Sequence, residues 1–259
     1  MSGILWDALV FGPIKSRRLG NSLGVNLLPG NDKICTFNCV YCECGWGQNP
    51  LGIKEDFNKA DLVLKALENR LLELKSENFP LNSITFAGNG EPTLHPDFSS
   101  LVDDVIQLRN KYFPNSIITC LSNSTTVGNE DVRNALMKLD NPWMKLDAGS
   151  QKMFSLINQD FQDLKIEDIV RHLVKMNGQL SIQTLFLRGV FEGQKIDNTT
   201  QEELGLWLSH LARIKPQKVI IYPIDRATPL LGLEKIEAEE LEQLASKIRE
   251  AGFKTEVYY

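Results

Sequence analysis

Four of the five cysteines of the chain lie within one short segment, Cys-Thr-Phe-Asn-Cys-Val-Tyr-Cys-Glu-Cys at positions 35–44. Three of them, Cys35, Cys39 and Cys42, have the spacing Cys-x3-Cys-x2-Cys. Three thiolates on one tight loop suit an iron–sulfur cube that is held at three of its corners. The fourth iron then has no protein ligand, so it can bind and activate a further molecule.

The fourth thiol of this segment, Cys44, leaves a second interpretation open. A tetrahedral zinc site needs four protein ligands, and a zinc-binding interaction module would use Cys35, Cys39, Cys42 and Cys44 together. In the iron–sulfur interpretation Cys44 is a bystander, because a fourth protein ligand would close the site. A colourless protein that carries one zinc ion would favour the zinc module.

A second segment, Gly-Asn-Gly-Glu-Pro-Thr-Leu at positions 88–94, directly follows a predicted strand at 83–87. Glycines let a backbone edge approach a ligand closely. Backbone carbonyls together with the carboxylate of Glu91 can accept hydrogen bonds from an ammonium group. Taken alone, the segment is a weak signal and is better interpreted as a simple turn; its place at the end of a strand after the three-cysteine loop makes it a strong one.

Polar residues also accompany two later predicted strands. Ser122 and Asn123 follow a strand at 117–121, and Gln183 lies within a strand at 180–187. In barrels of parallel strands, ligands bind at the carboxyl ends of the strands. For Ser122 and Asn123, capping of the following turn is the alternative interpretation.

Lys145 and Asp147 share one face of a predicted strand at 143–147, because side chains alternate along a strand. An unpaired amine is costly to bury in apolar surroundings. Lys145 therefore either reaches solvent or points into a polar interior. We expect both side chains to face the interior of a barrel, with Lys145 near a substrate.

Four arginines are candidates for binding an anion. Arg17 and Arg18 precede a predicted strand at 22–28, whereas Arg188 and Arg226 follow the fifth and sixth predicted strands. Arginine binds phosphate and carboxylate groups through two parallel hydrogen bonds. The alternative is that Arg17 and Arg18 only pair with local carboxylates.

Apolar strands alternate with amphipathic helices along the chain, which predicts an α/β fold and a single domain over residues 1–259. Six strand–helix units with right-handed crossovers would curl into a partial six-stranded parallel barrel, although the pattern also fits an open doubly wound sheet. In the barrel, residues 1–21 form an N-terminal extension, 22–229 the partial barrel, and 230–259 a C-terminal helix and strand.

The composition excludes several other classes of protein. The chain has 259 residues, 42% hydrophobic and 24% charged, and no apolar run approaches the roughly 20 residues of a membrane span. The N-terminus lacks the pattern of a signal peptide, so we expect a cytoplasmic protein with reduced thiols and no membrane partner. The formal net charge of -5 weighs against a general nucleic-acid binder.

The cysteine spacing, with Tyr41 directly before the last cysteine, resembles the signature of the radical S-adenosylmethionine (SAM) superfamily. The segment at 88–91 resembles the Gly-Gly-Glu segment of that superfamily, which receives the amino group of the methionine moiety. Asp147 matches the Leu-Asp that closes strand four in many members, near the ribose of SAM. The resemblance implies these cofactor-binding residues: Tyr41, Gly88, Asn89, Gly90, Glu91, Ser122, Asn123, Asp147 and Gln183.

The resemblance also implies the partial barrel rather than the open sheet, with a [4Fe–4S] cluster on Cys35, Cys39 and Cys42 and SAM as the second cofactor. In the family, an electron from the reduced cluster breaks a sulfur–carbon bond of SAM. The resulting 5′-deoxyadenosyl radical abstracts hydrogen from a substrate. A low-potential electron donor of flavodoxin or ferredoxin type is therefore an expected partner.

The stretch Gly-Pro-x-x-Ser-Arg-Arg-Leu-Gly-x-Ser-Leu-Gly at 12–24 resembles a branch of Fe–S oxidoreductases related to the wybutosine-pathway tRNA enzyme. A tRNA substrate is thus one alternative. The acidic net charge favours a small anionic or nucleotide-like substrate, contacted by Lys145 and the four arginines. A glycyl-radical activase is a further alternative, although the Lys-x-Asp of strand four differs from the Asp-x-Lys often seen in activases.

Overall fold

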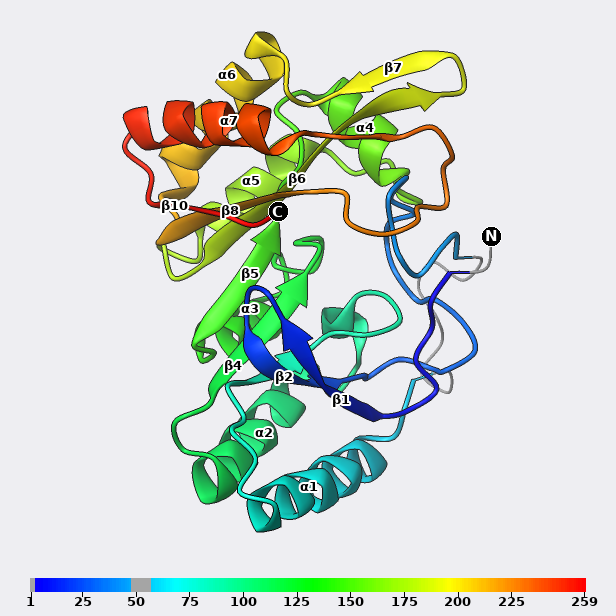
Figure 1. The fold of residues 1–259 in the computed structure, drawn as a ribbon, viewed down its shortest axis with the longest axis vertical. Coiled ribbons are helices and arrows are strands. Elements are labelled where there is room, and N and C mark those ends of the chain that lie inside the picture. The colour runs from blue at the N-terminus through cyan, green and yellow to red at the C-terminus, as the bar shows by residue number, and fades with distance from the viewer. Residues whose placement is uncertain (1–2, 48–56) are drawn as a thin grey trace.

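A curved sheet of mostly parallel strands forms the centre of the computed structural model, which describes residues 3–47 and 57–259 (Figure 1). The strand order is β1-β2-β3-β4-β5-β6-β8-β10, and β7 and β9 pair with the end of β6. The strands are β1 Val10–Ser16, β2 Gly20–Val25, β3 Ser83–Phe86, β4 Ile117–Ser122, β5 Asn141–Lys145, β6 Ser181–Phe191, β7 Gln194–Asp197, β8 Lys218–Pro223, β9 Glu234–Lys235 and β10 Thr255–Val257.

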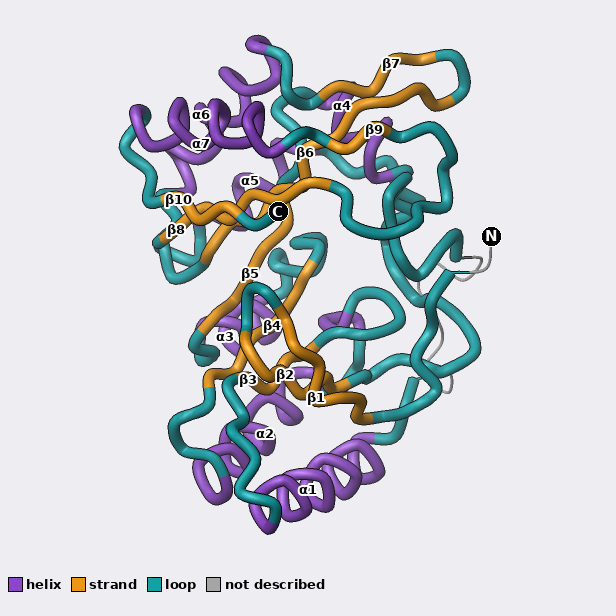
Figure 2. The backbone as a smooth tube through the Cα atoms, in the orientation of Figure 1, coloured by secondary structure: helices purple, strands orange, loops and turns teal. Residues whose placement is uncertain are grey.

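Strands β2, β3, β4, β5, β6 and β8 run parallel in this order, and β10 extends the parallel set beyond β8. Only the added strands are antiparallel: β1 pairs with β2, and β7 and β9 pair with β6. Because parallel strands need crossover connections, the helices lie between them in sequence and on the outside of the sheet in space (Figure 2). They are α1 Ala60–Ser76, α2 Phe98–Tyr112, α3 Glu130–Met137, α4 Gln151–Asn158, α5 Ile166–Val174, α6 Gln201–Ile214 and α7 Ala238–Glu250.

The two faces of the sheet differ in polarity. On β3, Ile84 and Phe86 face the helices and are fully buried. On the other face of β3 lie Ser83 and Thr85, which form a hydroxyl chain with Ser22 of β2 at oxygen separations of 2.7 and 3.0 Å. The concave face of the sheet is therefore polar on this side. A ligand can bind there while the apolar core on the helix side stays buried.

The hairpin of β1 and β2 inserts its tip against the interior face of the opposite strands. Leu19, at the tip, is 7% exposed and packs with Trp143 of β5 and Ile220 of β8. Alternation along β5 and β8 places Trp143 on the same face as Lys145, and Ile220 on the same face as Tyr222. The hairpin tip thus closes the interior from one end and leaves a hollow beyond it.

The predicted order of strands and helices is found in the structure, with differences in detail. Helix α1 begins after Lys59, and the side-chain amide of the nearby Asn58 donates to the backbone carbonyls of Asn26 and Leu28. The fourth strand lies two residues earlier than predicted, so Asp147 follows β5 rather than lying within it. None of the described helices has the length and apolar character needed to cross a bilayer.

Candidate functional site

One cavity of about 550 Å³ collects most of the residues that the sequence marks as candidates. This volume lies within the range of about 300–1,000 Å³ typical of small-molecule sites. The cavity is bordered by the carboxyl ends of β3, β4 and β8, the cysteine segment and the β1–β2 hairpin. The candidates that line it are Arg17, Arg18, Cys35, Cys39, Tyr41, Cys42, Gly88, Gly90, Glu91, Ser122, Asn123, Lys145, Gln183 and Arg226.

The cysteine segment is held between the end of β3 and helix α4. Its backbone pairs with Gly90, because the Ile34 carbonyl accepts from the Glu91 amide at 2.9 Å. On the other side the Val40 amide donates to the Ile157 carbonyl at 2.9 Å. Gly90 must be a glycine here, since it has a φ of +135° and a Cβ would lie 1.9 Å from the Ile34 carbonyl oxygen.

The thiols lie in contrasting electrostatic surroundings. Burial raises the pKa of Cys35 to about 12, although its sulfur accepts a hydrogen bond from the Asn123 amide at 3.3 Å. A hydrogen bond with the Cys44 side chain lowers the pKa of Cys42 to about 6. Lys33 lies 3% exposed beside all four thiols; burial lowers the pKa of its amine, but the thiolates raise it and the net direction is upward. This lysine favours thiolates, the form in which cysteine binds metal.

The donor set fits a multi-iron cluster better than a single ion. Within residues 3–47 and 57–259, no three His, Cys, Asp or Glu side chains converge on one point where a metal ion could lie. Cys35, Cys39 and Cys42 nevertheless border one cavity. A cluster needs this arrangement, because each thiolate holds a different iron.

Glu91 joins the ends of β3 and β4 to the cysteine segment. It is 1% exposed, and it accepts hydrogen bonds from the amide and hydroxyl of Thr93 and from the amide of Asn123. Burial raises the pKa of this carboxyl, and these donors only partly oppose the shift. One Glu91 oxygen accepts two of these bonds and the other accepts one, so acceptor capacity remains for a ligand.

Asn89 does not line the cavity, in contrast to its neighbours Gly88 and Gly90. Its side chain is fully buried and bonds to the backbone of Trp6 at 2.8 and 2.9 Å and to the Pro29 carbonyl. The prediction that Asn89 is a cofactor-binding side chain is therefore corrected: it ties the N-terminal segment to the end of β3.

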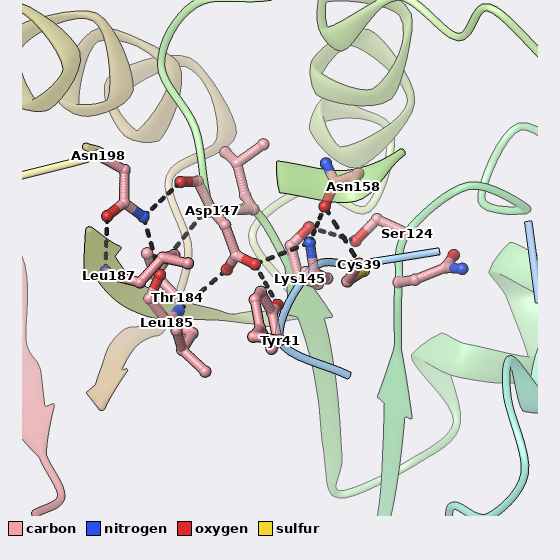
Figure 3. A network of polar contacts seen from close by, with 12 residues as sticks. Cys39, Tyr41, Ser124, Lys145, Asp147, Asn158, Thr184, Leu185, Leu187 and Asn198 are labelled. Carbon is pink, nitrogen blue, oxygen red and sulfur yellow. Dashed lines mark hydrogen bonds and ion pairs between the residues drawn. The ribbon is translucent and has the colours of Figure 1, made fainter. Parts of the chain in front are cut away.

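Lys145 and Asp147 form a buried ion pair at the end of β5, with 2.7 Å between Nζ and Oδ2 (Figure 3). The side chain of Lys145 is 10% exposed at the cavity wall, and that of Asp147 is 0% exposed behind it. Asp147 also accepts from the Tyr41 hydroxyl and from the Leu185 amide, and Lys145 donates to Asn158. Neither side chain is directed out to solvent, but only Lys145 lines the cavity.

The four candidate arginines have different surroundings. Arg17 pairs with Asp225 at 2.6 Å and Arg226 with Glu43, and all four of these side chains are about half exposed at the cavity rim. Arg18 lies deeper, with its guanidinium carbon 4.6 Å from the ring centre of Tyr222.

Arg188 lies outside the cavity, which corrects the prediction that it borders the site. It pairs with Glu240 of α7 and lies 3.4 Å from Asp197 of β7. The reason is that β6 does not end at residue 187 but continues to Phe191 and turns into β7. Arg188 is therefore part of a structural ion-pair group.

Sequence reasoning overlooked several residues that shape the site. Lys33 precedes the first cysteine by two positions, and a cation so close to the thiols was a usable signal. Asn158, at the end of α4, receives hydrogen bonds from both Lys145 and Cys39. Tyr222 and Asn158 had no local signal, because contacts between distant segments bring them to the site.

The family model of the radical SAM superfamily matches residues 33–186. A UPF0026 protein of Helicobacter pylori (strain 26695) is 32% identical over 237 residues, which cover 90% of this chain and 71% of that protein. The chain therefore belongs to the radical SAM superfamily, and within it to the UPF0026 proteins. It is also 31% identical to a protein of Brachyspira hyodysenteriae named GTPase Obg. That match covers 96% of this chain but only 34% of the length of the Brachyspira protein. The chain spans 61% of the length of a UPF0026 protein of Methanocaldococcus jannaschii.

Solved structures confirm the predicted fold. A radical SAM methyltransferase from Sphaerobacter thermophilus aligns with a TM-score of 0.66 at 13% identity, over 92% of this chain and 66% of that one. TYW1 with a lysine-pyruvate adduct aligns with a TM-score of 0.60 at 16% identity, over 88% of this chain and 73% of that one. At these identities the likeness shows the shared fold, the partial parallel barrel of the superfamily.

Proposed function

We propose that this protein is a radical SAM enzyme that holds a [4Fe–4S] cluster on Cys35, Cys39 and Cys42 and cleaves SAM reductively. When bound, the two cofactors supply a 5′-deoxyadenosyl radical that abstracts hydrogen from the substrate. The observation that carries this proposal is the cavity itself. Three thiols border it together with the strand-end segment Gly88–Glu91, whose acceptors suit an ammonium group.

The chain's own residues have separate tasks in this proposal. Lys33 compensates the negative charge of the thiolates, and Asn123 donates to the sulfur of Cys35 at 3.3 Å. Glu91 and the Gly88 carbonyl face the amino group of SAM. Ser122, Gln183 and Tyr41 border the cavity and would face the nucleoside of SAM, and Asp147 orients Tyr41 from behind by accepting its hydroxyl. Burial of the site keeps water away from a reactive carbon radical.

The substrate in this proposal is a small anionic or nucleotide-like molecule. The rim arginines Arg17 and Arg226 already have carboxylate partners, which reduces what they offer to an RNA backbone. A tRNA substrate remains the alternative, favoured by the fold likeness to TYW1. The electron donor we propose is a low-potential protein of flavodoxin or ferredoxin type.

The test of this function is anaerobic turnover of the reconstituted chain with SAM and a strong reductant. We expect methionine and 5′-deoxyadenosine in equal amounts, both measured by chromatography, and neither without reductant. Intact SAM after prolonged incubation with cluster-loaded protein would contradict the proposal. A comparison of metabolites and tRNA nucleosides with and without the gene would then separate the two substrate classes.

Replacing Glu91 by glutamine should weaken SAM binding about tenfold to hundredfold, because a hydrogen bond to a charged group contributes about 1.5–3 kcal/mol. Calorimetric titration of cluster-loaded protein measures this change. Thr93→Val is the matched control, since it removes an internal donor to Glu91 and keeps the carboxylate. Equal losses in the two variants would show that Glu91 only shapes the loop and does not contact SAM.

A further inference from the structure

Arg18 is held inside the cavity by the hairpin tip and by two aromatic rings. Its neighbour Leu19 is anchored between Trp143 and Ile220. The Arg18 guanidinium lies over Tyr222 at 4.6 Å and over Trp143 at 5.5 Å, distances typical of cation–π contacts. This packing fixes the plane of the guanidinium while its hydrogen-bonding edges stay available.

No carboxylate of the described residues forms an ion pair with Arg18. In that part of the chain its side chain donates over a long distance, 3.4 Å from Nη1 to the side-chain oxygen of Gln183, and also hydrogen-bonds the Tyr222 side chain. A guanidinium carries five N–H donors. Most of the donors of Arg18 therefore lack a protein acceptor, even though the residue borders a cavity rather than open solvent.

The other cations around the cavity are already compensated or screened. Arg17 and Arg226 pair with carboxylates at the rim, and Lys145 pairs with Asp147. Lys33 lies among the thiols, as described above. Lys15 also lines the cavity but is exposed, so solvent and salt screen its charge. Among the cavity-lining cations of residues 3–47 and 57–259, one fixed and uncompensated positive charge remains, that of Arg18.

We propose that Arg18 binds a carboxylate group of the substrate. The proposal rests on the proposed function, because it places the substrate in the same cavity as SAM. A planar carboxylate matches the guanidinium fork with two parallel hydrogen bonds. Its single negative charge also matches the one fixed and unpaired cation that the described residues place in the cavity, whereas a phosphate dianion would call for a second one.

The test uses three probes with one aromatic body: benzoate, its neutral isostere benzamide, and phenyl phosphate. Each is titrated into the full chain, with and without the cluster, and binding is followed by calorimetry and by the fluorescence of Trp143, identified with a Trp143→Phe variant. We expect benzoate to bind more tightly than benzamide and phenyl phosphate. Arg18→Met should weaken benzoate binding about tenfold to hundredfold.

Two further variants keep the result interpretable. Arg18→Lys retains the charge without the fork and should lie between wild type and Arg18→Met. Arg249→Gln removes an arginine from the outer helix α7 and should leave benzoate affinity unchanged. Circular dichroism establishes whether each variant is folded. If Arg18→Met does not fold, the weaker benzoate binding of Arg18→Lys serves as the test instead.

Three outcomes would overturn the assignment. Equal affinity for benzoate and benzamide would mean that no anion site exists, and stronger Arg18-dependent binding of phenyl phosphate would assign Arg18 to phosphate. Competition between SAM and benzoate would place Arg18 at the cofactor's own carboxylate. Because these titrations need no turnover, Arg18-dependent benzoate binding without SAM cleavage would refute the proposed function and leave the carboxylate site standing.

Discussion

Replacing Cys35, Cys39 or Cys42 by alanine, one at a time, should reduce bound iron from about four atoms per chain to nearly none, because a cubane needs each of its three protein thiolates. Anaerobic reconstitution followed by iron and sulfide analysis measures the loss, and the brown colour should disappear with it. The three thiols belong to one segment held between Gly90 and Ile157. The rest of the fold does not depend on their sulfurs, so the variants should remain folded.

Cys44 and Cys120 provide matched controls for this experiment. Cys44 also lines the cavity, but its thiol is 3.4 Å from the Gly88 carbonyl, to which it donates. Cys120 is fully buried in β4 on the face packed against the helices. Alanine at either position should keep the iron. A Cys44→Ala protein without iron, beside a Cys42→Ala protein that retains it, would reverse the ligand assignment.

The main strands could be predicted because each is a short apolar run followed by polar or glycine residues. The two helices α3 and α4 were not anticipated, since each has only eight residues, too few for a helical period to show clearly. The fourth strand was placed too late because it contains Pro142, a residue that normally argues against a strand. Local sequence patterns therefore predicted the presence of the main strands better than they predicted the residues at which those strands begin and end.

The site was predictable where its residues are neighbours in sequence, as in the cysteine segment and at Gly88–Glu91. It was not predictable where distant segments meet. Asn198 joins the Asp147 and Leu185 carbonyls with hydrogen bonds of 2.8 Å, yet it lies in a loop with no motif around it (Figure 3). The prediction that Arg188 borders the site failed because β6 continues to Phe191. The partner of Arg188, Glu240, lies on a helix 52 residues further along the chain, so no local pattern could indicate the pair.

Removing one partner of the buried ion pair of Lys145 and Asp147 should cost much stability. Asp147→Asn leaves the amine of Lys145 without a counter-charge at a position only 10% exposed. Removing one partner of a buried pair costs about 3–5 kcal/mol, and we expect about 3 kcal/mol because the cavity gives Lys145 some access to water. Urea unfolding of the cluster-free chain measures this loss. It corresponds to a decrease in Tm of roughly 6–12 °C.

The expected loss should be constant through the neutral pH range. Burial lowers the pKa of Lys145, but Asp147 and Cys39 raise it and the net direction is upward. Stability from a group whose pKa is raised on folding is present below its unfolded pKa, 10.5 for lysine, and is lost only as the pH rises through the folded value. A loss of stability that disappears within the neutral range, well below pH 10.5, would therefore point to another group.

Two controls separate the buried charge from the lost hydrogen bonds. The double variant Lys145→Met with Asp147→Asn removes the stranded cation, and it should recover most of the stability lost in Asp147→Asn alone. Asp103→Asn breaks an ion pair with Lys138 in which both side chains are about half exposed, and it should cost less than about 1 kcal/mol. If the double variant were no more stable than the single one, the loss would come from the Tyr41 and Leu185 hydrogen bonds to Asp147 and not from an unpaired lysine.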